Sequence, residues 1–307
     1  MRHLNILGSL FIVVFLFLGC DSRENNQKDS KKEIAFYYWN SKCIIRENFS
    51  FSLFVKVLDI GTKNIIKTSC KNRNYIPVVY IDNKALKNKD IKKLSKLIFD
   101  TISSDSKEVQ FDCDWTQSTK EKYFIFLKEM KKHYKNVSAT IRLHQLKYQK
   151  KTGIPPVDSG VLMFYNMSDF LSSNTKNYIL DLNEAKKYLS GFKSYPLRLD
   201  LALPIYSMAT VFRYGRVVSL IDSVRVDMLD SRFEKLSNNR YRVLKTHYFR
   251  GKLLYRGDEI RIDEVSLDML KRAIGIIPFE YKRVIFFRYS PNFSDRFIKE
   301  IQSLVEA

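Results

Sequence analysis

Glu-Val-Gln-Phe-Asp-Cys-Asp-Trp-Thr-Gln, residues 108–117, is a short apolar run that carries two aspartates in its second half. In a β-strand over Val109–Trp115, alternate side chains point to opposite faces, so Gln110, Asp112 and Asp114 share one face. On an exposed antiparallel strand these polar side chains would simply face water. The surrounding Gly, Pro and helix signals instead predict a buried parallel strand, and carboxylates on the inner face of a barrel indicate a functional site. The other face would hold Val109, Phe111, Cys113 and Trp115.

Similar apolar runs, several of them followed by helical segments, continue along the chain, which is the pattern of a parallel sheet. Eight runs qualify as strands, and the 307 residues leave room for the roughly 250 of a (β/α)8 barrel. The predicted strands are Ile34–Trp39, Leu53–Leu58, Ile76–Ile81, Val109–Trp115, Val137–Leu143, Gly160–Asn166, Leu197–Pro204 and Arg283–Tyr289. The predicted helices between and after them are Asp90–Ile102, Thr119–Tyr134, Asn183–Phe192 and Ser294–Val305.

One interval does not follow this alternation of strands and helices. Ser207–Lys282, between the seventh and eighth predicted strands, is too long for a plain connecting loop. It contains short alternating runs such as Arg216–Ile221 and Tyr241–Tyr248, and a helical pattern at Ser266–Gly275. The predicted fold is therefore an α/β protein, a (β/α)8 TIM barrel over residues 34–307 with a small β-rich subdomain inserted at about 207–282.

The N-terminus looks like a targeting segment. Arg2 precedes an apolar run, Leu10–Leu18, that is too short for a standard membrane span, and Cys20 follows it. Residues 1–19 are similar to the signal peptide of a bacterial lipoprotein, in which Cys20 would be lipidated; ordinary secretion is the alternative. Residues 20–33 are polar and predict a flexible tether. We expect an exported protein of the cell envelope, periplasmic or at the cell surface, held to a membrane by a lipid anchor.

The net charge of +20 is strongly basic, yet no nucleic-acid-binding module accompanies it. Lys-rich surface helices exposed to water explain the charge, and an anionic partner in the envelope is the alternative. We therefore expect no nucleic acid partner, and a monomer.

Three cysteines follow Cys20. Cys43 and Cys70 could form a disulfide in an oxidising compartment, whereas Cys113 lies on the strand face that should pack under helices and is expected to be a buried thiol. The histidines are scattered without a metal-ligand spacing. The sequence therefore predicts neither a metal nor a cofactor.

In a barrel of this kind the working residues lie at the C-terminal ends of the strands. Aromatic, amide, guanidinium and carboxylate groups gather at these ends, and they suit a sugar ring, because aromatic faces stack on it and polar groups meet its hydroxyls. Asp114 and Asp112 are the candidate catalytic residues. The candidate substrate-binding residues are Trp39, Asp82, Trp115, Arg142, His144, Gln145, Tyr165, Asn166, Asp200, Tyr206 and Arg288.

These motifs resemble the chitinase-type glycoside hydrolases, which use the acetamido group of the substrate as the nucleophile. The fourth strand of that family carries Asp-x-x-Asp-x-Asp-x-Glu. Here Asp112 and Asp114 match its middle, and Val109 and Thr116 replace the outer acids. The usual catalytic Glu is thus replaced by Thr116.

Two further motifs follow in the order of that family. Met163-Phe-Tyr-Asn166 resembles its sixth-strand Met-x-Tyr-Asp, with Asn in place of Asp. Leu203-Pro-Ile-Tyr206 resembles the segment that leads into its inserted domain. The whole chain is also similar to an uncharacterised bacterial lipoprotein family with a glycoside-hydrolase-like barrel, most clearly over Phe111–Thr116, Ser138–Gln145 and Gly153–Met167.

The resemblance implies a barrel that binds or processes an oligosaccharide at its mouth. Thr116 cannot be a general acid, so a step normally worth about 10²–10⁴-fold has lost its donor. Either the site binds glycan without cleaving it, or Asp114 serves as the acid with its pKa raised by Asp112, and Asp82 or Asp200 supplies the second carboxylate. A scaffold with an occluded cleft is a third alternative. Asp112 could also be a structural charge paired with Arg142 or Arg198.

Overall fold

The computed structural model describes residues 32–45, 49–70, 74–290 and 298–306. The predicted signal peptide, Cys20 and the tether up to Lys31 lie outside the described residues. These described residues form one compact unit. Within the described ranges, no helix is long and apolar enough to span a bilayer.

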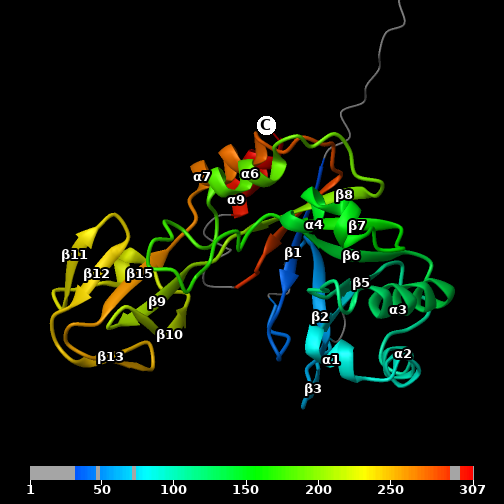
Figure 1. Ribbon diagram of the computed structural model, residues 1–307, viewed down its shortest axis with the longest axis horizontal. Helices are drawn as coiled ribbons and strands as arrows, with labels where there is room; N and C mark the ends of the chain where they lie inside the picture. The colour runs from blue at the N-terminus through cyan, green and yellow to red at the C-terminus, as the bar shows by residue number, and fades with distance from the viewer. Residues whose placement is uncertain (1–31, 46–48, 71–73, 291–297, 307) are drawn as a thin grey trace, which may run out of the picture. The chain divides into compact units, whose positions relative to one another are not determined.

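Eight parallel strands form a closed barrel (Figure 1). Neighbours pair in the order β1-β16-β8-β7-β6-β5-β4-β2, and β1 pairs with β2 to close the ring. The predicted barrel is confirmed, and each predicted strand has its counterpart within a few residues. The bounds are β1 Glu33–Tyr38, β2 Ser52–Ile60, β4 Ile76–Ile81, β5 Val109–Asp112, β6 Val137–Arg142, β7 Ser159–Met163, β8 Arg198–Pro204 and β16 Arg283–Phe287.

Helices cover the outside of the barrel. Polar side chains cap the starts of α1, α2, α6 and α7; at α2, for example, Asp90 accepts a hydrogen bond from the Lys93 amide at 3.0 Å. Phe111 of β5 packs edge-on against Phe126 of α3, with ring centroids 5.1 Å apart. The described helices are α1 Asn83–Asn88, α2 Ile91–Phe99, α3 Lys120–His133, α4 Leu143–Lys147, α5 Gln149–Thr152, α6 Leu182–Leu189, α7 Leu267–Ile274 and α9 Ile298–Glu306.

Strand β5 has the predicted alternation of faces, although it ends at Asp112 instead of Trp115. Gln110 points into the lumen, where its side-chain oxygen accepts a hydrogen bond from the Tyr37 hydroxyl at 2.7 Å. Cys113 is a buried free thiol on the other face, as predicted. Trp115 continues that outer face and stacks on Tyr123 of α3. The chain after Asp112 leaves the sheet and forms the loop into α3.

A disulfide joins Cys43, after β1, to Cys70, after β3 (Ile65–Lys67), with Cα atoms 5.2 Å apart. Strand β3 extends the barrel sheet by pairing antiparallel with β2. The cross-link therefore ties the loop after β1 to the β2–β3 hairpin. It also lowers the conformational entropy of the unfolded chain, which stabilises the folded state.

The interval before β16 is a β-rich insertion with its own core. Five antiparallel strands pair in the order β10-β9-β15-β12-β11, and Val211, Ile260 and Ile262 are among the side chains buried on one face of this sheet. A separate hairpin, β13–β14, packs its Phe249 and Leu254 into the same core. The bounds are β9 Met208–Arg213, β10 Arg216–Asp222, β11 Phe233–Ser237, β12 Arg240–Val243, β13 His247–Phe249, β14 Lys252–Leu254 and β15 Glu259–Asp263.

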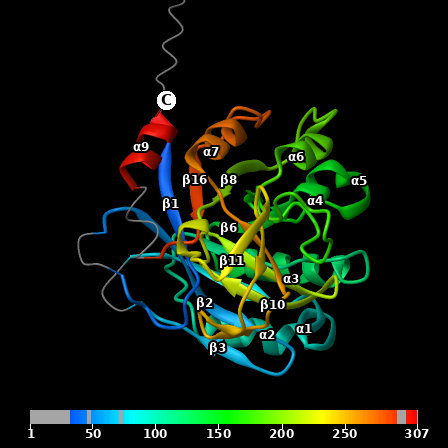
Figure 2. The same cartoon turned by 90° about the vertical axis from the view of Figure 1, so that its left-hand side faces the viewer.

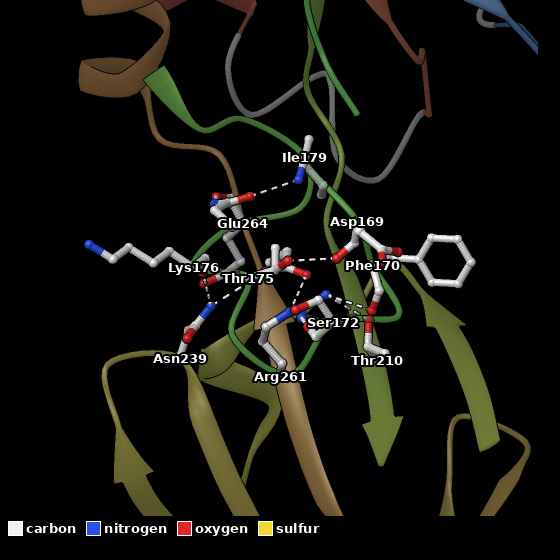
Figure 3. A network of polar contacts seen from close by, with 12 residues as sticks. Asp169, Phe170, Ser172, Thr175, Lys176, Ile179, Thr210, Asn239, Arg261 and Glu264 are labelled. Carbon is white, nitrogen blue, oxygen red and sulfur yellow. Dashed lines mark hydrogen bonds and ion pairs between the residues drawn. The ribbon is translucent and has the colours of Figure 1, made fainter. Parts of the chain in front are cut away.

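A buried arginine ties this insertion to the segment that follows β7 (Figure 3). Arg261 of β15 is 0% exposed, pairs with Asp263 at 2.9 Å and donates to the Ser172 carbonyl at 2.9 Å. Asn239 donates to the Lys176 carbonyl at 2.7 Å. These bonds satisfy loop carbonyls, so the loop after β7 is held against the sheet of the insertion.

Candidate functional site

The centre of the candidate site is a carboxylate inside the barrel mouth. Asp112, the last residue of β5, is 8% exposed and accepts a hydrogen bond from the Thr140 hydroxyl of β6 at 2.7 Å. Burial raises the pKa of Asp112 to about 6, and the negative charge of Asp114 adds to this shift. Asp112 is therefore a carboxyl group that holds its proton up to nearly neutral pH.

Asp114 lies above it, just past the end of β5, and its side chain is 47% exposed. Both of its oxygens accept hydrogen bonds from Arg142, one from Nε and one from Nη2. Arg142 ends β6, and its backbone amide donates to the side-chain oxygen of Gln145 at 2.8 Å. Both oxygens are therefore already engaged by one guanidinium, and this bidentate pairing opposes a role for Asp114 as a proton donor.

A cluster of aromatic rings stands beside the carboxylates. Phe287 at the end of β16 stacks on Tyr165 with centroids 5.1 Å apart, and it meets the edges of Trp39 and Tyr206, each at 5.6 Å. Trp39 is partly exposed, and Lys56 of β2 lies 5.2 Å from the centre of its ring. The cluster offers an apolar face next to charged groups, which is the combination that binds a sugar ring.

A small pocket opens between α4, α6 and the end of β7. Its volume is about 150 Å³. The Asn166 side-chain oxygen accepts a hydrogen bond from the Tyr206 hydroxyl. Partial desolvation lowers the pKa of His144, and the Arg142 guanidinium acts in the same direction, while the charge of Asp114 opposes it. The lining residues are Arg142, Leu143, His144, Met163, Tyr165, Asn166, Met167 and Tyr188.

Two of the predicted binding residues lie elsewhere. Trp115 is buried against α3 because the alternation of side chains that begins in β5 turns it to the outside of the barrel. Its ring nitrogen donates a hydrogen bond to the Thr152 carbonyl at 3.2 Å. Asp200 is fully buried and pairs with Arg283 at 2.8 Å and with Arg198 at 3.2 Å. Both arginines begin strands, so Asp200 belongs to the N-terminal end of the barrel. Neither residue belongs to the group at the mouth.

Other predicted residues have structural partners. Asp82 caps α1 by accepting from the Ala85 amide at 3.0 Å, and Arg288 pairs with Asp222 of β10 in the insertion. Thr116 forms hydrogen bonds with its neighbours in the loop, including Ser118 at 3.0 Å.

Sequence reasoning missed Phe287 and Lys56. Phe287 is one of several aromatic residues in its strand, and the sequence does not indicate which ring reaches the mouth. The signal for Lys56 was a charged residue inside an otherwise apolar strand, where it pairs with Asp59 at 2.6 Å. Among the described residues, no three His, Cys, Asp or Glu side chains are grouped so that they could hold a metal ion.

At the level of sequence, no family model and no curated protein matches this chain. Solved structures do match. The C-terminal domain of a protein assigned as a chitinase from Desulfitobacterium hafniense aligns with a TM-score of 0.57 at 11% identity, covering 90% of this chain and 99% of that one. The chain shares the barrel fold of chitinases.

Two further structures support this assignment of the fold. A class V chitinase from Nicotiana tobaccum, solved in complex with NAG4, aligns with a TM-score of 0.53 at 11% identity over 90% of this chain and 99% of the other. The Bacillus cereus spore cortex-lytic enzyme SleL aligns at 0.51 and 12% identity over 88% and 74%. At such identities the likeness concerns the arrangement of strands and helices.

Proposed function

We propose that the mouth of the barrel binds an oligosaccharide without cleaving it. The bidentate pairing of Asp114 with Arg142 carries this proposal. A glycosidase needs a protonated carboxyl group beside the scissile bond, and in the chitinase-type enzymes the acetamido group of the substrate takes the place of the second carboxylate. Here both oxygens of the more exposed aspartate already accept hydrogen bonds from a guanidinium, and a threonine stands where the chitinase-type enzymes carry Glu.

The aromatic cluster supports binding of sugar rings. Trp39 is partly exposed at the mouth, and its ring meets Phe287 and Tyr37 in edge contacts. Such rings lose little conformational entropy on binding because their neighbours already fix them. The tobacco chitinase that shares this fold was solved with NAG4, so an amino-sugar oligomer is the first ligand to test.

Hydrolysis is the second candidate, and Asp112 is the observation in its favour. Its raised pKa keeps a proton available near neutral pH, as a general acid requires. Its burial and its bond to Thr140 oppose direct contact with a glycosidic oxygen.

We further propose that the protein works in the cell envelope, exported and held by a lipid on Cys20. The composition of residues 1–20 supports this, and so does the Cys43–Cys70 disulfide, since such bonds persist in oxidising compartments. Metabolic labelling with a fatty acid, compared with the Cys20→Ala variant, tests the anchor.

Calorimetric titration of the full chain with chitohexaose, followed by chromatography of the same mixture, tests the function. Binding without shorter products supports the proposal. Shorter products that disappear in Asp112→Asn would establish hydrolysis instead. Absence of heat with chitohexaose and with other neutral and acidic hexasaccharides would refute glycan binding. Trp39→Ala should reduce the affinity, while Trp115→Phe, a matched aromatic change under α3, should leave it unchanged.

A further inference from the structure

A strongly basic surface lies on α4, α5 and α6, and we call it the lysine surface. Residues 142–157 and residues 185–199 contain no Asp or Glu. Both segments expose cations in and around these three helices. The lysine surface consists of Lys147, Lys150, Lys151, Lys186 and Lys193.

Contacts between the two segments bring these cations together. Lys147 donates through Nζ to the Lys187 carbonyl at 2.5 Å. Gln149 donates through Nε2 to the Ser194 carbonyl at 3.0 Å, which places the start of α5 beside the segment that holds Lys193. Figure 2 shows α4, α5 and α6 grouped on one side of the barrel. The positive charges are therefore neighbours in space, although they come from two parts of the chain.

Few carboxylates neutralise this surface. Lys187 pairs with Glu184 at 2.5 Å and is for that reason left out of the lysine surface. None of the five lysines forms an ion pair with a described residue. Tyr148 lies among them, 51% exposed, with the Lys147 ammonium 5.7 Å from its ring centre. Unpaired like charges repel one another, and an anionic ligand would relieve that repulsion.

The lysine surface and the small pocket are built from the same two segments of the chain. The small pocket beside Asp114 has walls from both segments: Arg142 and His144 from the start of α4, and Tyr188 from α6. A chain of sugars that extends from this pocket along α4 and α6 would first meet Lys147, Tyr148 and Lys186. An aromatic side chain set among cations suits a carboxylated or sulfated sugar better than a neutral one.

We infer that the ligand is an anionic glycan that runs from the barrel mouth across the lysine surface. This inference rests on the proposed glycan binding and adds the chemical class. An anionic bilayer would also be attracted by lysines, but it would not enter the pocket between α4 and α6.

The test compares two hexasaccharides on the full chain by calorimetry. Chitohexaose is neutral, and hyaluronan hexasaccharide carries a carboxylate on every second sugar. We expect hyaluronan hexasaccharide to bind about tenfold more tightly at about 50 mM salt, with most of that advantage lost at about 200 mM, because salt screens exposed charges. The advantage should disappear in the variant Lys150→Gln, Lys151→Gln, Lys193→Gln, whose exposed side chains make no contacts that folding requires.

The matched control is Lys92→Gln, Lys93→Gln, Lys128→Gln, which removes the same charge from exposed positions of α2 and α3 and should keep the advantage. Equal affinities for the two sugars would overturn the inference and leave glycan binding intact. Loss of the tighter binding of hyaluronan hexasaccharide in the control variant would also overturn the inference, because the net charge of the protein alone would then explain the preference. Binding to phosphatidylglycerol vesicles through the three lysines, without a preference for hyaluronan, would assign this surface to a membrane and refute the inference.

Discussion

Replacing Asp112 by Asn should stabilise the protein at neutral pH and not at acidic pH. Asn keeps the side-chain oxygen that accepts from Thr140 and removes the buried negative charge. Burial, followed by the charge of Asp114, raises the pKa of Asp112 from 3.8 to about 6 in the folded state. The folded protein therefore binds this proton more tightly than the unfolded chain does.

The sign and size of the effect follow from this difference. Stability contributed by the protonated carboxyl is fully present below pH 3.8 and is lost as the pH rises to about 6. At about 1.4 kcal/mol for each pH unit, the loss is about 3 kcal/mol, and it stays constant at higher pH. Asp112→Asn lacks this titration, so its free energy of unfolding should exceed that of the wild type by up to about 3 kcal/mol near pH 7.5.

Urea unfolding followed by tryptophan fluorescence measures the difference in the free energy of unfolding between Asp112→Asn and the wild type, once at pH 4 and once at pH 7.5. Asp105→Asn, which removes an exposed carboxylate outside the lumen, is the control and should show little change at either pH. If this difference were the same at pH 4 and at pH 7.5, the argument that the buried charge of Asp112 destabilises the protein would be refuted.

Three more outcomes are expected. Trp39→Ala should weaken binding of chitohexaose about tenfold by calorimetry, because it removes the partly exposed ring of the cluster. Replacing both Cys43 and Cys70 by Ser should lower the free energy of unfolding by roughly 3 kcal/mol in urea titrations, since the unfolded chain regains loop entropy. Arg261→Met should cost roughly 3–5 kcal/mol by leaving Asp263 buried and unpaired, and limited proteolysis should then cut the loop after β7; a loop as resistant as in the wild type would contradict its attachment through Arg261.

The barrel could be predicted from local patterns. Apolar runs of strand length, alternating with helical segments, identify all eight strands. The alternation of side chains along β5 places Asp112 on the opposite face from Phe111 and Trp115. This works because the alternation of strand faces and the capping of helices involve residues close together in the chain. The alternation of faces also excludes Trp115 from the lumen, although its aromatic ring at the C-terminal end of the strand made it a candidate for the mouth.

The site depends on partners that are distant in sequence. Asp114 was a candidate acid until the structure placed both oxygens on Arg142, which is 28 residues away. Asp200 was a candidate until it was found beside Arg283 at the opposite end of the strands, 83 residues away. The register between parallel strands sets such pairs, and register follows from packing the whole barrel. Composition and periodicity thus determine which face each residue takes, whereas the closed sheet determines which charges and rings meet across it.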